Sequence, residues 1–392
     1  MDALFPFGFP LPTAFYLVLY VVTWIVHAFF MAYVVAGTGY LACACLCRRD
    51  DGAGCSPHGL ASVLLDWMPF AVSAAVTAGV APLLFIQILH QESFYTANLL
   101  LFHRWMAILP VLILGAYTLY LLLMANSRGY ARWLRSLLAL LAFGCFLFTA
   151  YSWTENHLLS LARMSWPAFY SSGSVFYLNR ELLPRLLFLL AGCIPTMLVM
   201  VLWQLHWYER YCGRPAPVAE LRKASRAALF GLGITVAAFV FYVMLAGDPI
   251  RGQCLCVLAG PWVITGIIGT FLEGWGWRRL LGGAAPGARL LGLLTVATGL
   301  RWLGTAVLRE TARLATADLP TEFARHEQAF HVGGFGTFLT FAALNGLLLA
   351  LCTLVVSRGL KRDEASCPTA PEPPATPPAP SGPPAPAADP AS

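Results

Sequence analysis

Long apolar stretches recur along this chain of 392 residues. A helix that crosses the hydrocarbon core of a bilayer needs about 20 predominantly apolar residues, and no water is available there to bind an exposed backbone group. Nine stretches reach that length, at residues 12–44, 67–90, 103–125, 134–153, 184–207, 228–247, 257–276, 289–308 and 332–357. The sequence therefore predicts an all-α fold, a polytopic membrane helix bundle of about nine transmembrane helices.

The composition agrees with this prediction. Hydrophobic residues make up 58% of the chain and charged residues only 11%, whereas soluble domains average about 45–50% and about 25%. Too few charges are present to cover the surface of a soluble protein of this size. These values exclude a nucleic-acid-binding protein, a secreted disulfide scaffold and a cytosolic enzyme, and they make the lipid bilayer the expected surroundings.

The 11 cysteines follow no spacing that is typical of cofactor attachment. The chain contains no Cys-x-x-Cys-His, so covalent c-type haem is excluded, and it contains no Cys-x-x-Cys pair. Cys254 and Cys256 lie in a short connection between two apolar stretches. Two interpretations stay open for this pair: small apolar side chains, or a redox or metal role.

The distribution of basic residues predicts the orientation. Sixteen of the 25 basic residues fall in the tail and in the connections that follow odd-numbered stretches: Arg48, Arg49, Arg128, Arg132, Arg135, Arg210, Arg214, Arg222, Lys223, Arg226, Arg278, Arg279, Arg289, Arg358, Lys361 and Arg362. Cytoplasmic connections carry such an excess of Lys and Arg. We therefore expect the N terminus outside and the C terminus in the cytoplasm. The first stretch lacks a basic leader and a small-residue cleavage site, so we expect it to be retained.

The chain divides by composition into two parts. Residues 1–362 are expected to form the transmembrane helical domain. Residues 363–392 contain 11 prolines and no aromatic residue, so they have no apolar surface to bury. We expect this Pro/Ala-rich part to be a disordered cytoplasmic tail.

With that orientation, five of the eight histidines lie on the outer side. We expect His90, His103 and His331 to contribute to cofactor binding, although a histidine at the interface can also simply face water. A further outer cluster is suited to proton exit, because histidine titrates near neutral pH. It comprises Glu92, Glu155, His157, His326 and Glu327.

Two ionisable residues lie deeper than these. His27 is about halfway along the first stretch, and it is interpreted as a haem ligand, a proton relay or a residue hydrogen-bonded to a neighbouring helix. Arg301 is about twelve residues into the eighth stretch, so we expect it to face the bundle interior and to pair with a carboxylate or a haem propionate. Glu273 is near the inner end of the seventh stretch, where we expect it to snorkel toward water.

The longest outer connection, residues 154–183, carries an apolar helical face. It is expected to lie along the membrane surface as an amphipathic helix. Such a helix is either a lid over a lipid-soluble substrate or a plain connector.

Several short motifs resemble those of one family. The first helix resembles that of the cytochrome bd oxidase subunit I superfamily in Phe9-Pro10-Leu11-Pro12, in Trp24-Ile25-Val26-His27 and in Gly37. Within that superfamily, the chain is similar to divergent bd-like membrane proteins encoded near c-type cytochromes. The stretches that carry this second resemblance are Gly79-Val80-Ala81-Pro82-Leu83-Leu84-Phe85, Phe94-Tyr95-Thr96-Ala97-Asn98, Phe148-Thr149-Ala150 and Pro184-Arg185.

The resemblance implies a function. His27 matches the position of a ligand to high-spin haem b, so the implied cofactors are haem b and quinone, with His27 as the iron ligand and Arg301 beside a propionate. The implied protein is an electron-transfer subunit of a respiratory complex in the bacterial inner membrane, and it could be part of a quinol-oxidising oxidoreductase. Its implied partners are other membrane subunits and an external c-type cytochrome, which would exchange electrons with a cofactor near the outer face.

The chain also departs from the family. Only about ten residues replace the long outer quinol-binding loop, and Leu187-Phe188 stand where relatives carry a histidine. A low-spin haem at that position and oxygen reduction are therefore left open. Two alternatives to an electron-transfer subunit also stay open: a cofactor-free anchor for external redox partners, and a small-molecule transporter.

Overall fold

The computed structural model describes residues 4–47, 59–213, 217–245, 252 and 256–332, together with scattered positions between 336 and 358. The chain divides into two compact units, residues 1–341 and residues 342–392. Within the described ranges the regular structure is helical and contains no strand. The prediction of an all-α fold is confirmed at this level.

Eight long helices form the first unit: α1 (Leu11–Cys47), α2 (Leu60–Leu89), α4 (Phe102–Ser127), α5 (Arg132–Leu161), α7 (Leu182–Cys212), α8 (Val218–Leu245), α10 (Gly260–Leu281) and α11 (Ala288–Thr316). Seven of them are long and apolar enough to cross a membrane, and the exception is α10. The chain is therefore a multi-pass membrane protein.

The eight helices correspond to the first eight predicted stretches, but most of them are longer. For example, α5 continues to Leu161, whereas the apolar stretch ends at residue 153. The helix continues because its last turns point polar side chains into the bundle, among them Ser152 and Glu155. The ninth predicted span, residues 332–357, and the predicted tail fall largely outside the described residues, so the count of nine stays a prediction.

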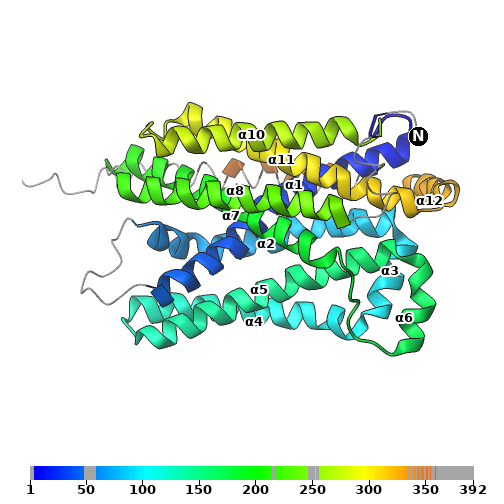
Figure 1. The fold of residues 1–392 in the computed structure, drawn as a ribbon, viewed down its shortest axis with the longest axis horizontal. Helices are drawn as coiled ribbons and strands as arrows, with labels where there is room; N and C mark the ends of the chain where they lie inside the picture. Colours follow the sequence, from blue (N-terminus) through cyan, green and yellow to red (C-terminus); the bar gives the residue numbers. More distant parts are fainter. Residues whose placement is uncertain are drawn as a thin grey trace, which may run out of the picture. The chain divides into compact units, whose positions relative to one another are not determined.

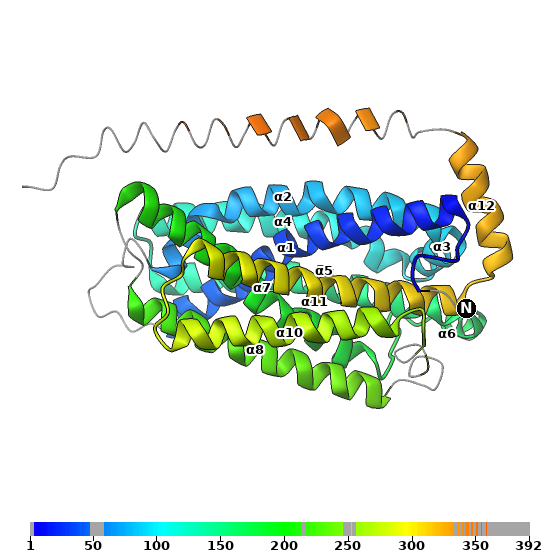
Figure 2. The same cartoon turned by 90° about the horizontal axis from the view of Figure 1, so that it is seen from above.

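Helices that are adjacent in sequence pack as antiparallel neighbours, with α1 against α2, α4 against α5, α7 against α8 and α10 against α11 (Figures 1 and 2). Because α1 also contacts α5, α7 and α11, it lies at the centre of the bundle. Two clusters of buried apolar side chains fill the interior: one includes Tyr33, Met68 and Trp277, and the other includes Trp24 and Trp302.

Three short helices gather at one end of the bundle, which we call the α12 end (Figure 1). They are α3 (Gln91–Leu100), α6 (Trp166–Ser172) and α12 (Leu319–Val332), and α12 runs across the bundle axis (Figure 2). The structure corrects the prediction of one amphipathic helix over residues 154–183. Residues up to Leu161 belong to α5, and the single 3-10 turn Arg163–Ser165 and the seven-residue α6 follow.

Helices α10 and α11 pack closely because both carry glycine where they touch. A Cβ atom on Gly304 would lie 2.6 Å from the carbonyl oxygen of Trp262 and 2.8 Å from the Cα of Gly266. A Cβ atom on Gly269 would lie 2.6 Å from the carbonyl oxygen of Ala297. Small residues of this kind allow membrane helices to approach at backbone distance.

Candidate functional site

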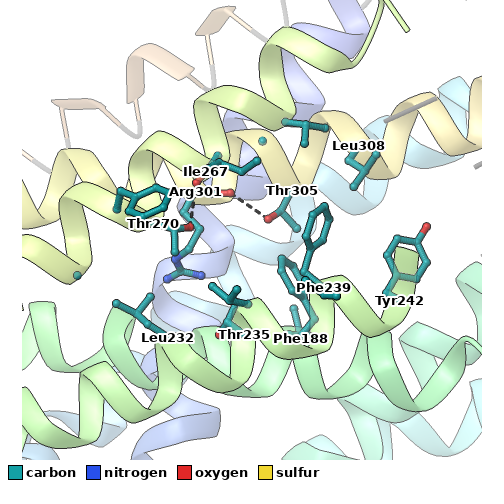
Figure 3. A pocket seen from close by; sticks show the side chains of 18 of the residues that line it. Phe188, Leu232, Thr235, Phe239, Tyr242, Ile267, Thr270, Arg301, Thr305 and Leu308 are labelled. Atoms are coloured by element: carbon teal, nitrogen blue, oxygen red, sulfur yellow. Dashed lines mark hydrogen bonds between the residues drawn. The ribbon is translucent and has the colours of Figure 1, made fainter. Parts of the chain in front are cut away.

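The first unit contains a cavity of about 1310 Å³. Its walls come from α7, α8, α10 and α11, and Trp24 of α1 together with Thr154 and His157 of α5 complete the lining. Figure 3 shows the apolar side chains of Phe188, Phe239 and Ile267 around it, with Arg301 at one side. The volume exceeds the range of about 300–1,000 Å³ that is typical of sites for small ligands. An apolar molecule of considerable size therefore fits between these helices.

All the described charged side chains that line the cavity are positive. Arg185, Arg278, Arg301 and Arg309 line it together with His157, and no Asp or Glu is among its described lining residues. A buried cation is costly unless it is paired and hydrogen-bonded. The partners of these arginines therefore decide what the cavity can hold.

Arg301 is held by α10 and α7. Its Nε donates to Glu273 at 2.9 Å, and its Nη2 donates to the carbonyl oxygen of Gly192 at 3.0 Å and to Thr196 Oγ1 at 2.8 Å. A Cβ atom on Gly192 would lie 2.7 Å from Arg301 Nη1, so glycine is what leaves room for the guanidinium. Nη1 itself is buried without a hydrogen-bond partner. One donor of Arg301 is therefore left for a ligand.

The carboxylate that pairs with Arg301 corrects a prediction. Glu273 is fully buried, and its second oxygen accepts a hydrogen bond from Thr298 at 2.9 Å. It does not snorkel, because α10 continues to Leu281 and keeps Glu273 inside the bundle. The expectation that Arg301 faces the interior and pairs with an anion is met by this carboxylate.

His157 is the histidine of the cavity lining. It is 3% exposed, and neither ring nitrogen has a hydrogen-bond partner. The positive charges of Arg185, Arg309 and Arg313 act on it electrostatically. The sequence analysis places His157 in an outer cluster, but the extended α5 carries it into the bundle. A buried imidazole with two unused nitrogens is unusual, because buried polar groups are nearly always paired.

Two ion pairs lie near His157 at the α12 end of the cavity, and a third lies farther along α11. Arg185 donates to Glu181 at 2.8 Å and to the hydroxyl of Tyr242 at 3.1 Å. Glu310 accepts hydrogen bonds from Arg313 and, at 2.8 Å, from His90. The third pair, Arg301 with Glu273, lies two helical turns along α11 from Arg309.

Arg309 differs from these arginines. Within the described ranges it has no carboxylate within ion-pair distance, and its Nε is buried without a hydrogen-bond partner. Its guanidinium lies over the ring of Trp24, 5.4 Å from the centroid.

His27 does not belong to the cavity lining. Its Nδ1 donates to the carbonyl oxygen of Ala75 at 3.0 Å, which leaves Nε2 as the remaining nitrogen. The ring lies against Gly79, where an added Cβ would be 2.9 Å from Cε1. His27 therefore makes a hydrogen bond to the neighbouring helix α2, which was one of the three interpretations of this residue. Iron ligation by His27 stays a prediction.

The other predicted site residues are spread over the α12 end. His103, Glu92, Glu327 and His331 are exposed, and the last two form a pair at 3.9 Å. Glu155 is buried, but it pairs with Arg104 and accepts a hydrogen bond from the backbone of Tyr177 at 2.7 Å. Of the predicted site residues, the structure thus places His157 and Arg301 in the cavity lining, bonds His90 to Glu310 of α11, and leaves the others outside the lining.

His326 connects α12 to the bundle. Its Nε2 donates to the carbonyl oxygen of Leu89 at 3.0 Å, so its Nδ1 accepts from Thr13 Oγ1 at 2.9 Å. Burial lowers the pKa of His326, and the charge on Arg325 acts in the same direction. Burial raises the pKa of Glu322 on the same helix, although His90 and Arg325 act against it.

A metal site made of protein ligands alone is not part of the described structure. No group of three or more His, Cys, Asp or Glu side chains comes together in the described ranges. Of the cysteine pair, Cys256 is half-buried at the start of the turn before α10, and Cys254 lies outside the described residues.

Sequence reasoning missed the cavity and three of its four arginines as site residues. Arg185 occurs there only in a family motif, Arg278 only among the basic residues of the connections, and Arg309 is not singled out. A positional signal could have identified Arg309, because Arg301, Thr305 and Arg309 follow at intervals of four and share one face of α11. The comparisons with known proteins add no name to this site, since no family model, curated protein or solved structure matches the chain.

Proposed function

We propose that the chain is an electron-transfer subunit of a membrane complex, and that it holds a b-type haem in the cavity between α7, α8, α10 and α11. The observation that carries the proposal is the buried His157, which lines an apolar cavity with both ring nitrogens unused. An unprotonated imidazole is a common haem ligand, and the interior of a helix bundle is a usual place for the group.

The residues of the cavity fit this cofactor. His157 would ligate the iron, and the propionates would lie against arginines at the α12 end, where Arg309 has no acidic partner among the described residues. The phenyl rings of Phe188 and Phe239 supply apolar walls. The group, when bound, takes up and releases single electrons, while the protein supplies ligands, burial and charge. Arg301 Nη1 offers one further donor inside the cavity.

Quinone binding in the same cavity is the second candidate. The lining residues Val240, Ile267 and Phe271 are exposed, and we propose that the cavity opens to the lipid phase between α8 and α10. A lipid-soluble head group could enter from the bilayer there, and its carbonyl oxygens would accept hydrogen bonds from His157 or Arg301. Quinol oxidation near this end would release protons on the same side.

The proposal includes the orientation and the partners that the sequence predicts. We propose that the α12 end faces outside, because the opposite end carries the basic connections, among them Arg128, Arg222 and Arg279. The chain would then have nine spans in a bacterial inner membrane and would exchange electrons with an external c-type cytochrome.

The test is the haem content and the reduced-minus-oxidised spectrum of the purified protein. We expect a pyridine haemochrome signal in the wild type, its loss in His157→Gly, and its return when imidazole is added to that variant. His27→Ala and the exposed His103→Ala serve as controls, and both should keep the spectrum. If the haem signal is lost only in His27→Ala, the iron ligand is His27 of α1 and not His157. If the wild type takes up no haem, the haem proposal is refuted and quinone binding remains. Quinone binding would then be measured with a spin-labelled short-chain quinone.

A further inference from the structure

The arginines buried around the cavity outnumber their acidic partners. Arg185 pairs with Glu181, Arg301 with Glu273 and Arg313 with Glu310. Arg309 has no carboxylate within ion-pair distance in the part of the chain that the structure describes. Arg278, which also lines the cavity, is exposed near the opposite end of α10 and is left out of this count. Among Arg185, Arg301, Arg309 and Arg313, four positive charges therefore face three glutamates, and one positive charge is left over.

The excess charge lies where it is costly. Arg309 is in α11, one of the helices that can cross the membrane, and it lines the cavity. Its contact with the Trp24 ring, 5.4 Å from the centroid, compensates only part of the cost of burying the charge. A charge within the membrane is costly and is nearly always paired. The group of arginines around the cavity therefore lacks one negatively charged partner among the described residues, the partner of Arg309.

Two further polar groups point to a ligand in the same cavity. His157 and Arg301 are each 3% exposed, and both ring nitrogens of His157 and Nη1 of Arg301 lack partners. Arg301 and Arg309 are eight residues apart on one face of α11, which corresponds to about 12 Å along the helix axis. Leu308 and Ile267 are among the apolar residues that line the cavity alongside them. The cavity therefore has a cationic α12 end and a long apolar body.

We propose that the α12 end of the cavity binds one anionic group, a carboxylate or a phosphate, on an elongated apolar molecule that lies along α11 with its charge on Arg309. This inference shares its cavity with the proposed function and rests on it only for the location, not for iron ligation by His157. Two sources supply the chemistry: a haem propionate, or the head group of an acidic lipid. A ligand with a neutral head would leave Arg309 without its counter-ion.

The experiment compares charged probes with neutral esters of the same shape. One pair is a spin-labelled stearic acid and its methyl ester at alkaline pH, and the other is haem and its dimethyl ester. Each is titrated into delipidated wild type, Arg309→Gln, Arg309→Lys and the control Arg289→Gln, which removes an exposed arginine of the same helix. The immobilised spin-label signal and the Soret absorption report binding separately.

We expect wild type and Arg289→Gln to bind the charged member of at least one pair about tenfold or more tightly than its ester, the value of one charge-assisted hydrogen bond. The preference should disappear in Arg309→Gln and remain in Arg309→Lys. Without ligand, Arg309→Gln should also melt above the wild type, because it removes a charge in the cavity that has no carboxylate partner in the described structure. A role confined to packing on Trp24 predicts a lower melting temperature.

The outcomes separate this inference from the haem proposal. Preference for the fatty acid without any haem uptake keeps the anion site and refutes haem binding. If haem and its dimethyl ester bind with equal affinity, and stearic acid and its methyl ester also bind equally, the anion site is refuted. The haem proposal then stands. The comparison of acid with ester in the wild type needs no substitution, so it decides even if Arg309→Gln fails to fold.

Discussion

Replacing Glu273 with Gln would leave the Arg301 guanidinium buried without its carboxylate partner. Breaking a buried ion pair by removing one member costs about 3–5 kcal/mol, because the remaining charge has lost its compensation. We expect Glu273→Gln to lower the free energy of unfolding by about that amount, measured by denaturation in detergent. The control is Glu209→Gln, which changes an exposed carboxylate in α7 and should have little effect. Equal stability of the two variants would contradict the assignment of Glu273 as the partner of Arg301.

The depth of single residues was predictable only in part. Arg301 was placed correctly in the interior, because it lies in the middle of an apolar stretch. His157 was placed outside, because polar residues from Ser152 to Asn156 end the apolar stretch before it. Hydropathy cannot distinguish a polar side chain in water from one that points into a bundle. The structure makes that distinction, since Ser152, Glu155 and His157 are all buried in α5.

At the scale of elements, the contact of α10 with α11 depends on glycine. A Cβ atom on Gly304 would meet the backbone of α10 at 2.6 Å, so Gly304→Ala must push the two helices apart. We expect a loss of about 1–3 kcal/mol, the usual cost of overpacking. Gly299→Ala on the same helix meets nothing within 4 Å and should gain up to about 1 kcal/mol from helix propensity. The prediction fails if the two substitutions change the melting temperature in the same direction.

The attachment of α12 should depend on pH through two groups of opposite sign. The pKa of His326 is lower in the folded protein than its ordinary value of about 6.5. Its contribution to stability is therefore complete above that value and is lost as the pH falls through the folded pKa. The pKa of Glu322 is raised, so its charged form costs stability at neutral pH, and protonation in acid relieves that cost.

Hydrogen exchange of α12 measured between neutral and mildly acidic pH checks these signs. Glu322→Gln should lose protection more steeply in acid than the wild type, because only the His326 effect remains. His326→Gln should gain protection in acid, because a glutamine amide can still bond Leu89 and Thr13 without titrating. His90 and Arg325 act on both groups, Glu92 and Arg163 act on Glu322, and all four residues are unchanged in these variants. Identical pH profiles for the two variants would refute the assignment.

At the scale of the whole molecule, the orientation can be tested at two exposed serines. Ser171 lies in α6 at the α12 end, and Ser127 ends α4 at the opposite end. In a background without native cysteines, Ser171→Cys should react with a membrane-impermeant maleimide on intact cells. Ser127→Cys should react only after the membrane is opened. The reverse pattern would place the α12 end in the cytoplasm and overturn the proposed exit of electrons to an external cytochrome.

The helical class and the number of long helices up to α11 could be predicted from the sequence. A membrane span must form all its backbone hydrogen bonds within the helix and must be apolar, so it is visible in the sequence as a long apolar stretch. The cavity did not follow. It depends on how α7, α8, α10 and α11 are spaced, and that spacing is set by side chains as small as those of Gly192 and Gly269, whose role becomes visible only with their neighbours in place.

The weak apolarity of α10 has a consequence for how the chain enters the membrane during synthesis. Alone, α10 would carry Glu273 into lipid, and α11 alone would carry Arg301, which costs about 2.5–3.5 kcal/mol at the centre of a helix. The two helices are joined by only a few residues, from Gly282 to Gly287, and their charges neutralise each other at 2.9 Å. If α10 is a span, as the sequence predicts, we expect the two helices to insert together, because Arg301 of the later helix neutralises the charge of Glu273 in the earlier one.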